Sequence, residues 1–269
     1  MIPLKDDNPT SNKPVVTYFL IGSCVLIFLI QLSSQTYSTG QLFYSYGLIP
    51  SVLMGHKELP MDLYAIPAYL TIFTSMFMHG GWFHLIGNMV FLWIFGDNVE
   101  DAMGKTKFLI FYLLCGLLAA LLQSIIDPTS NIPMIGASGA IAGVLGAYLL
   151  LYPRANINVL MWIVIIVSII KVPAFIVLGF WIVSQFFSGA MADTSSGGVA
   201  YFAHIGGFIA GMSLIAFFKH PSVKMFQEGH SYAFETQEFR EFMDYGIPKD
   251  KTKGFMEDFI DKANRRKDK

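Results

Sequence analysis

Charged side chains are scarce in this chain. Asp, Glu, Lys and Arg together make up 14% of its 269 residues, against about a quarter in soluble globular domains. Hydrophobic residues reach 54% and the mean hydropathy is +0.53, which indicates a protein of the lipid bilayer. The formal net charge of −1 gives no basic excess, so the composition does not favour nucleic acid as a partner.

Cysteine is also rare. Cys24 and Cys115 are the only two, and both lie inside apolar stretches, where a thiol packs as a small hydrophobic group. We therefore expect neither a disulfide framework nor a structural zinc site, and the sequence predicts no metal and no cofactor. The first 14 residues have mixed charge and no basic region followed by an apolar run, so we expect no cleaved signal peptide.

Six apolar stretches are candidates for membrane-spanning helices, which need about 20 mostly apolar residues. They cover residues 15–32, 83–95, 108–126, 138–152, 172–187 and 201–218. A further apolar stretch, residues 156–170, is a candidate for a seventh crossing. Its many β-branched residues also suit an interfacial or re-entrant segment, and we retain six crossings.

The distribution of basic residues supports six crossings. With this count, one side of the membrane carries Lys5, Lys13, Lys105, Lys107, Arg154, Lys171 and the basic residues of the tail. The other side carries Lys57. Because basic loops face the cytoplasm, both termini are predicted to be cytoplasmic, and a seventh crossing would place the basic tail outside.

The chain divides into three regions on this pattern. Residues 1–13 form a cytoplasmic segment, 14–219 a membrane domain, and 220–269 a charged cytoplasmic tail. The first loop, residues 36–82, is too apolar and aromatic for an aqueous loop, so we expect it to lie in the membrane interface. Apolar spacing in the tail predicts short helices within residues 232–246 and 253–267.

A serine stands between glycines at the start of the fourth candidate helix, in "GASGAIAGVLG". Ser138 could be a small residue that lets helices approach, which is common in membranes. It could also be a nucleophile, because the free N–H groups of a helix N-terminus stabilise a developing oxyanion. Taken alone, the serine favours packing.

A serine hydroxyl becomes an effective nucleophile when a base accepts its proton. His204, in "AHIGGFIAG", lies in the sixth candidate helix, with Gly207 and Gly211 on the same helical face. The fourth candidate helix has a matching stripe of small residues, namely Gly139, Ala142, Gly143 and Gly146. Two such faces can pack closely, so the spacing predicts that His204 reaches Ser138.

His84 and Asn88, in "HGGWFHLIGNM", are four residues apart and share one face of the second candidate helix. Near the membrane surface this pair could be interfacial anchors. Alternatively, both side chains could point at Ser138 and, with a backbone N–H, bind an oxyanion. His79 has no carboxylate at ligand spacing, so a metal site there is not predicted.

The other polar and aromatic candidates have simpler interpretations. Solvated caps are expected at four acidic residues near the ends of candidate helices, Asp97, Glu100, Asp101 and Asp127. Interfacial or packing roles are expected for the four tryptophans, Trp82, Trp93, Trp162 and Trp181.

The motifs "HGGWFHLIGNM", "GASG" and "AHIGG" followed by Gly211, in this order on the second, fourth and sixth candidate helices, resemble those of the rhomboid intramembrane serine proteases. The resemblance covers about residues 14–219, and "FGDNVEDAMG" is similar to bacterial members. It implies an all-α, six-helix transmembrane bundle with a long interfacial first loop. It also implies a prokaryotic plasma membrane as the location.

The resemblance further implies a role for each site residue. Ser138 would be the nucleophile and His204 its general base, while His84, Asn88 and the Ser138 backbone N–H would bind the oxyanion. The implied partners are transmembrane protein substrates and the lipid bilayer.

Two positions depart from the family pattern. Many members carry a Trp-Arg pair in the first loop, which is absent here, and some carry an aromatic residue four positions after the serine, where this chain has Ala142. We therefore expect the imidazole to be held by a different ring or to be held less firmly.

Cleavage of transmembrane segments by a Ser138–His204 dyad is the predicted function. The alternative is a non-catalytic rhomboid-like protein that binds client transmembrane helices. Its hallmark would be loss of the serine or the histidine, and both are present. A small transporter would need discontinuous repeat halves and charges at the membrane midplane, which the sequence lacks.

Overall fold

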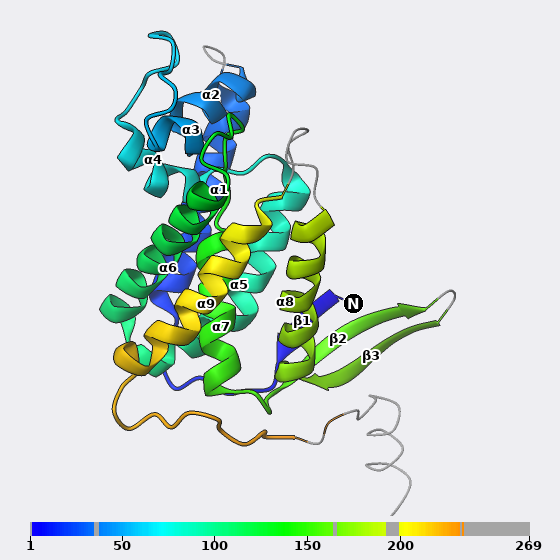
Figure 1. Ribbon diagram of the computed structural model, residues 1–269. Helices are drawn as coiled ribbons and strands as arrows, with labels where there is room; N and C mark the ends of the chain where they lie inside the picture. The colour runs from blue at the N-terminus through cyan, green and yellow to red at the C-terminus, as the bar shows by residue number, and fades with distance from the viewer. Residues whose placement is uncertain (1, 35–37, 164–165, 192–198, 232, 234–269) are drawn as a thin grey trace, which may run out of the picture.

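The computed structural model describes residues 2–34, 38–163, 166–191, 199–231 and 233, with residues 162, 163, 166 and 167 described by their backbone alone. Six long helices run side by side in this part of the chain (Figure 1). They are α1 (Val15–Ser33), α5 (Trp82–Met103), α6 (Lys105–Ile126), α7 (Ser138–Leu151), α8 (Ala174–Met191) and α9 (Tyr201–Phe218).

Each of the six predicted stretches overlaps one of these helices. Within the described residues, α1, α6, α8 and α9 are long and apolar enough to span a membrane. The chain is therefore an integral, multi-pass membrane protein. The second predicted stretch ends at residue 95, but α5 continues to Met103.

Helix α7 lies at the centre of the bundle, packed against α5, α6 and α9. Residues 140–148 are all buried, which suits a helix that is hydrophobic on every side. Its 14 residues rise about 21 Å, less than the hydrocarbon core of about 30 Å. Consequently α7 is too short to reach across the whole core of a bilayer.

Glycines let α9 approach α7 closely. A Cβ atom added at Gly207 would overlap the carbonyl oxygen of Gly139, and one added at Gly211 would overlap that of Gly143. No side chain larger than hydrogen fits at these two positions of α9 without moving the backbone of α7.

The small-residue stripe of α7 serves two neighbouring helices. Gly146 faces a backbone carbonyl of α9, whereas a Cβ added at Gly139 or Gly143 would meet the side chains of Ala119 and Cys115 on α6. This stripe therefore makes the contact with α9, the His204 helix, that its spacing predicts. It also packs α7 against α6.

The first loop carries short helices rather than an extended chain. They are α2 (Thr39–Tyr46), α3 (Pro50–Leu53), α4 (Ala68–Thr74) and the 3₁₀ turn η1 (Ser75–Phe77), and α2, α3 and α4 cluster at one end of the bundle (Figure 1). Leu48 exchanges two backbone hydrogen bonds, of 3.0 and 2.7 Å, with Met134 in the segment before α7. These contacts hold the entry to α7 against the first loop.

The apolar stretch 156–170 is not a helix. It lies in the antiparallel strands β2 (Asn156–Ile163) and β3 (Ile166–Pro173), and β1 (Ile2–Asp6) pairs with β2 to give the order β1-β2-β3. Its β-branched residues favour strands. The sheet lies at the end of the bundle opposite α2, α3 and α4 (Figure 1). This stretch is therefore not a seventh helical crossing, and its position relative to the bilayer stays a prediction.

The residues after α9 return to the sheet end of α7. The N–H groups of Phe226 and Gln227 donate to the carbonyl oxygens of Leu150 and Leu151 over 2.8 and 2.9 Å, which satisfies acceptors that a helix C-terminus leaves open. The two helices predicted in the tail lie outside the described residues, apart from residue 233.

Glu100 is a buried carboxylate, not a solvated cap. It is 3% exposed, and its two oxygens accept hydrogen bonds from the N–H groups of Val16 and Thr17 at 3.0 and 2.8 Å and from the Thr17 hydroxyl at 2.9 Å. The N-cap position of α1 is Pro14, which provides no side-chain cap. Glu100 of α5 therefore caps the N-terminus of α1, where the helix dipole favours a negative charge.

Replacing Glu100 with alanine is expected to lower the free energy of unfolding by about 3 kcal/mol, because buried donors of α1 lose their acceptor. Equilibrium unfolding in mixed detergent micelles measures the change. Glu58→Ala, in an exposed part of the first loop, is the matched control and should leave stability unchanged. Equal unfolding curves for the two variants would contradict the capping role.

Candidate active site

Ser138 is the first residue of α7. The turn before it requires glycine, since Gly136 has a φ of +119°, in the region that residues with a Cβ rarely adopt. The N–H of Gly136 donates to the carbonyl oxygen of Ser75 over 2.8 Å, which ties this turn to η1. Ala137, at the N-cap position, makes no side-chain cap bond, so it leaves the first N–H groups of α7 uncapped.

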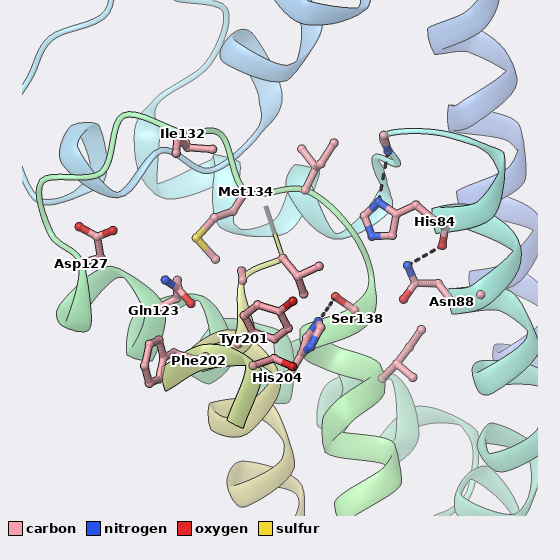
Figure 2. Close-up of a pocket in the computed structure, with 18 of the residues that line it drawn as sticks. His84, Asn88, Gln123, Asp127, Ile132, Met134, Ser138, Tyr201, Phe202 and His204 are labelled. Atoms are coloured by element: carbon pink, nitrogen blue, oxygen red, sulfur yellow. Dashed lines mark hydrogen bonds between the residues drawn. The ribbon is translucent and has the colours of Figure 1, made fainter. Parts of the chain in front are cut away.

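The structure brings Ser138 and His204 together. The distance from Ser138 Oγ to His204 Nε2 is 2.7 Å, and Figure 2 shows the two side chains pointing at each other from α7 and α9. His204 is 8% exposed. Close packing at Gly207, one turn along α9 from His204, positions this contact.

Two residues of α8 hold the other side of the imidazole. His204 Nδ1 lies 2.7 Å from Gln185 Oε1, and the Trp181 ring lies 5.8 Å from the imidazole, centroid to centroid, at an interplanar angle of 33°. Tyr201 adds an edge contact at 6.5 Å and 86°. The ring that the sequence lacks at Ala142 is thus supplied by α8 and by the first residue of α9.

His84 and Asn88 come from α5 and line the same cavity as Ser138 and His204. In Figure 2 they lie on the far side of Ser138 from His204. The Gly80 N–H donates to His84 Nδ1 over 3.3 Å, and Asn88 Nδ2 donates to the His84 carbonyl oxygen over 2.9 Å. Neither of these two hydrogen bonds involves Ser138.

His79 is fully buried and packs edge-on against His84, with 5.2 Å between the ring centroids. Its backbone exchanges two hydrogen bonds with the Gln31 side chain of α1, at 3.1 and 3.2 Å. Burial, reinforced by the neighbouring His84 and partly offset by the Phe77 carbonyl, lowers the pKa of His79 to about 4. His79 is therefore a neutral packing residue that fixes the segment before α5.

The cavity around these side chains has a volume of about 1160 Å³. Its wall combines the polar groups described above with apolar side chains, among them Phe83, Phe91 and Met134, while Gln123 and Asp127 line it from the end of α6 (Figure 2). A space of this size exceeds the usual pocket for a small molecule and can accommodate several residues of an extended peptide.

Gln185 is a site residue that the sequence predictions do not name, and Trp181 is one for which they give an interfacial or packing role alone. One signal for them exists, because Gln185 is a polar side chain inside an apolar predicted span, and such residues are functional candidates. Trp181 stands four residues earlier and therefore on the same face. No sequence pattern predicts how α8 packs against α9, and this packing is what directs Gln185 and Trp181 at His204.

The chain matches the family model described as the rhomboid domain over residues 67–221. Among curated proteins, it is 33% identical over 202 residues to rhomboid protease GluP of Bacillus subtilis, which covers 75% of this chain. It is 28% identical over 173 residues, or 60% of this chain, to rhomboid-like protein 11, chloroplastic, of Arabidopsis thaliana.

A third relative, rhomboid protein 1, mitochondrial, of Saccharomyces cerevisiae, is 25% identical over 209 residues, or 75% of this chain. The matched regions cover 34%, 57% and 55% of these three relatives. The chain thus spans about a third to just over half of the length of each.

Proposed function

We propose that this chain, which belongs to the rhomboid family, is a serine endopeptidase that cleaves transmembrane segments of other membrane proteins. The 2.7 Å contact between Ser138 Oγ and His204 Nε2 carries the proposal. Its setting supports the proposal further, because the pair lies in a cavity large enough for an extended peptide. The relative from Bacillus subtilis is named a protease.

The proposed reaction begins with proton transfer within the dyad. His204 Nε2 takes the hydroxyl proton as Ser138 Oγ attacks the peptide carbonyl carbon and forms a tetrahedral oxyanion. The carbon–nitrogen bond then breaks, and the imidazolium gives its proton to the leaving amine. Water then attacks the acyl-enzyme while His204 takes one of its protons. The bond between the acyl carbon and Ser138 Oγ breaks, the imidazolium returns that proton to Oγ, and the carboxylic acid product leaves.

His84 and Asn88 are proposed to bind the oxyanion together with the Ser138 backbone N–H. Because Gly80 N–H donates to His84 Nδ1, a neutral imidazole carries its hydrogen on Nε2. His84 Nε2 lies beside the turn before Ser138, since a Cβ added at Gly136 would be 2.6 Å from it. Asn88 uses one amide hydrogen on the His84 carbonyl and keeps a second for the oxyanion.

The length of α7 supports catalysis below the membrane surface. If α7 begins inside the bilayer and ends at the cytoplasmic side, its rise of about 21 Å leaves Ser138 several ångströms below the outer surface of a core of about 30 Å. The proposed architecture is a bundle of six crossings over residues 14–219, with residues 36–82 as an outer interfacial loop. The cavity would admit water to Ser138 from that side.

Covalent labelling tests the proposed function. A fluorophosphonate probe, which forms a bond with activated serines, should label the purified protein in micelles and fail to label Ser138→Ala. Ser130→Ala removes a different serine of the same cavity and should label like the parent. No labelling of the parent, together with no cleavage of reporter transmembrane segments, would favour the non-catalytic client-binding protein instead.

The proposed orientation places residues 1–13 and 220–269 in the cytoplasm of a prokaryotic cell, following the basic residues. Alkaline phosphatase is active outside the cytoplasm. Fused after residue 231 it should be inactive, and inserted near Lys57 it should be active. The reverse pattern would overturn this topology.

Asn88→Ala is expected to lower kcat for cleavage of a reporter transmembrane segment by about a hundredfold, because one oxyanion donor is lost. KM should change little, since the donor acts on the transition state. Initial rates in proteoliposomes at several substrate densities measure both constants. A change confined to KM would instead assign Asn88 to substrate binding.

A further inference from the structure

The imidazole of His204 has a hydrogen-bond partner at each ring nitrogen, and the dyad uses one of them. Nε2 faces Ser138, whereas Nδ1 lies 2.7 Å from Gln185 Oε1. Resting on the proposed function, we propose that Gln185 is a positioning residue. It fixes His204 in the tautomer that carries its hydrogen on Nδ1, so that Nε2 is free to accept the Ser138 proton.

The other contacts of Gln185 set the direction of its amide. Ser184 Oγ donates to the carbonyl oxygen of Trp181 over 2.6 Å. With its one hydrogen used, Ser184 Oγ accepts from Gln185 Nε2 over 3.1 Å, and Nε2 also lies 3.4 Å from the Trp181 carbonyl, which can only accept. The NH₂ group thus faces the backbone of α8, and Oε1 faces His204.

The direction of the amide determines the tautomer of His204. An amide oxygen only accepts hydrogen bonds, so the 2.7 Å contact requires a hydrogen on Nδ1. A neutral imidazole then has its lone pair on Nε2, opposite Ser138 Oγ. The other tautomer would set two acceptors, Nδ1 and Oε1, against each other and would leave Nε2 unable to take a proton.

Gln185 and Trp181 act from one face of α8. They are four residues apart, and the Trp181 ring covers the imidazole plane at 5.8 Å while Gln185 fixes the ring edge. A neutral amide also suits this place better than a carboxylate, because a charge at membrane depth is costly. A chain of hydrogen bonds between uncharged groups therefore runs from Ser138 through His204, Gln185 and Ser184 to the backbone carbonyl of Trp181.

Cleavage kinetics test the role of Gln185. Gln185→Leu keeps the size of the side chain but removes the acceptor, and it should lower kcat at least about tenfold with KM nearly unchanged. Gln185→Glu in its uncharged form, which burial at membrane depth favours, keeps an acceptor oxygen at the same place and should restore most of kcat. Val183→Leu, at an exposed position of α8, should behave like the parent. If the parent cleaves and Gln185→Leu cleaves equally well, the proposal is wrong.

The tautomer is measured without turnover, which separates this proposal from the proposed function. In protein labelled with ¹⁵N-histidine at pH about 8, the His204 signals are those missing from the His204→Ala spectrum. The parent should have a protonated Nδ1 and an unprotonated Nε2, and Gln185→Leu should mix the two tautomers. A parent with its hydrogen on Nε2 overturns the proposal even if cleavage is observed. A protein that shows the expected tautomer but does not cleave leaves it standing and contradicts the proposed function.

Discussion

Ser138→Ala and His204→Ala are each expected to lower the rate of reporter cleavage by at least about 10⁴-fold. Without the hydroxyl there is no nucleophile, and without the imidazole the hydroxyl, which lies 2.7 Å from Nε2, has no base for its proton. Cleavage of a fluorescent transmembrane reporter in proteoliposomes, followed over hours, has the range to measure this loss.

The double variant sharpens this prediction. Because the two groups act as one unit, Ser138→Ala combined with His204→Ala should be no slower than either single variant. Thermal unfolding of Ser138→Ala in micelles should stay close to that of the parent, since this substitution only shortens one side chain at the cavity wall. Additive losses, or residual cleavage near the parental rate in either single variant, would show that the pair is not the reacting dyad.

Hydrophobic stretches carry most of what the sequence predicts about this fold. The six long helices overlap the six predicted stretches. Four of these helices, α1, α6, α8 and α9, are apolar runs long enough to cross a bilayer, and such runs have few other structures available to them. The ends of helices are harder to predict. Helix α5 continues through Asp97, Glu100 and Asp101 to Met103, since the carboxylate of Glu100 is used by the N-terminus of another helix.

The β-hairpin illustrates what pattern alone does not settle. Residues 156–170 are apolar apart from Asn156, Asn158 and Ser168, and periodicity cannot distinguish a buried strand from a helix in such a run. Their β-branched residues favour a strand, but the third strand, β1, comes from a segment more than 150 positions away in the chain. A strand pairing between segments so far apart in the chain leaves no signal in the sequence pattern of either segment.

The candidate site also contains residues that the sequence predicts and residues that it does not. His84 and Asn88 are recognisable because they share one helix face, and Ser138 and His204 because small residues mark the two helix faces that meet. The structure places all four around one cavity. Gln185 and Trp181 are not recognisable in this way, because their contacts with His204 depend on how α8 packs against α9. The small-residue faces in the sequence pair Ser138 with His204 across two helices, whereas the partners that α8 contributes to His204 require the tertiary structure.

Gly207→Ala is expected to lower cleavage by at least about a hundredfold, since a displacement of about 1 Å at a reacting group costs this much. The added methyl group would overlap the carbonyl oxygen of Gly139. Backbone cannot rotate away as a side chain does, so α9 must move from α7 and carry His204 with it. Overpacking of this kind also costs about 1–3 kcal/mol of stability.

Gly22→Ala is the matched control for this prediction. A Cβ at Gly22 in α1 meets no atom within 4 Å, and alanine is the better helix former by about 1 kcal/mol, so the control should be as stable as the parent or more stable. Reporter cleavage and equilibrium unfolding in micelles measure both effects, and probe labelling of Ser138 separates them. If Gly207→Ala remains folded, cleavage and labelling should fall together, because the serine loses its base. Parental labelling by a folded Gly207→Ala would mean that the packing of α7 on α9 does not position His204.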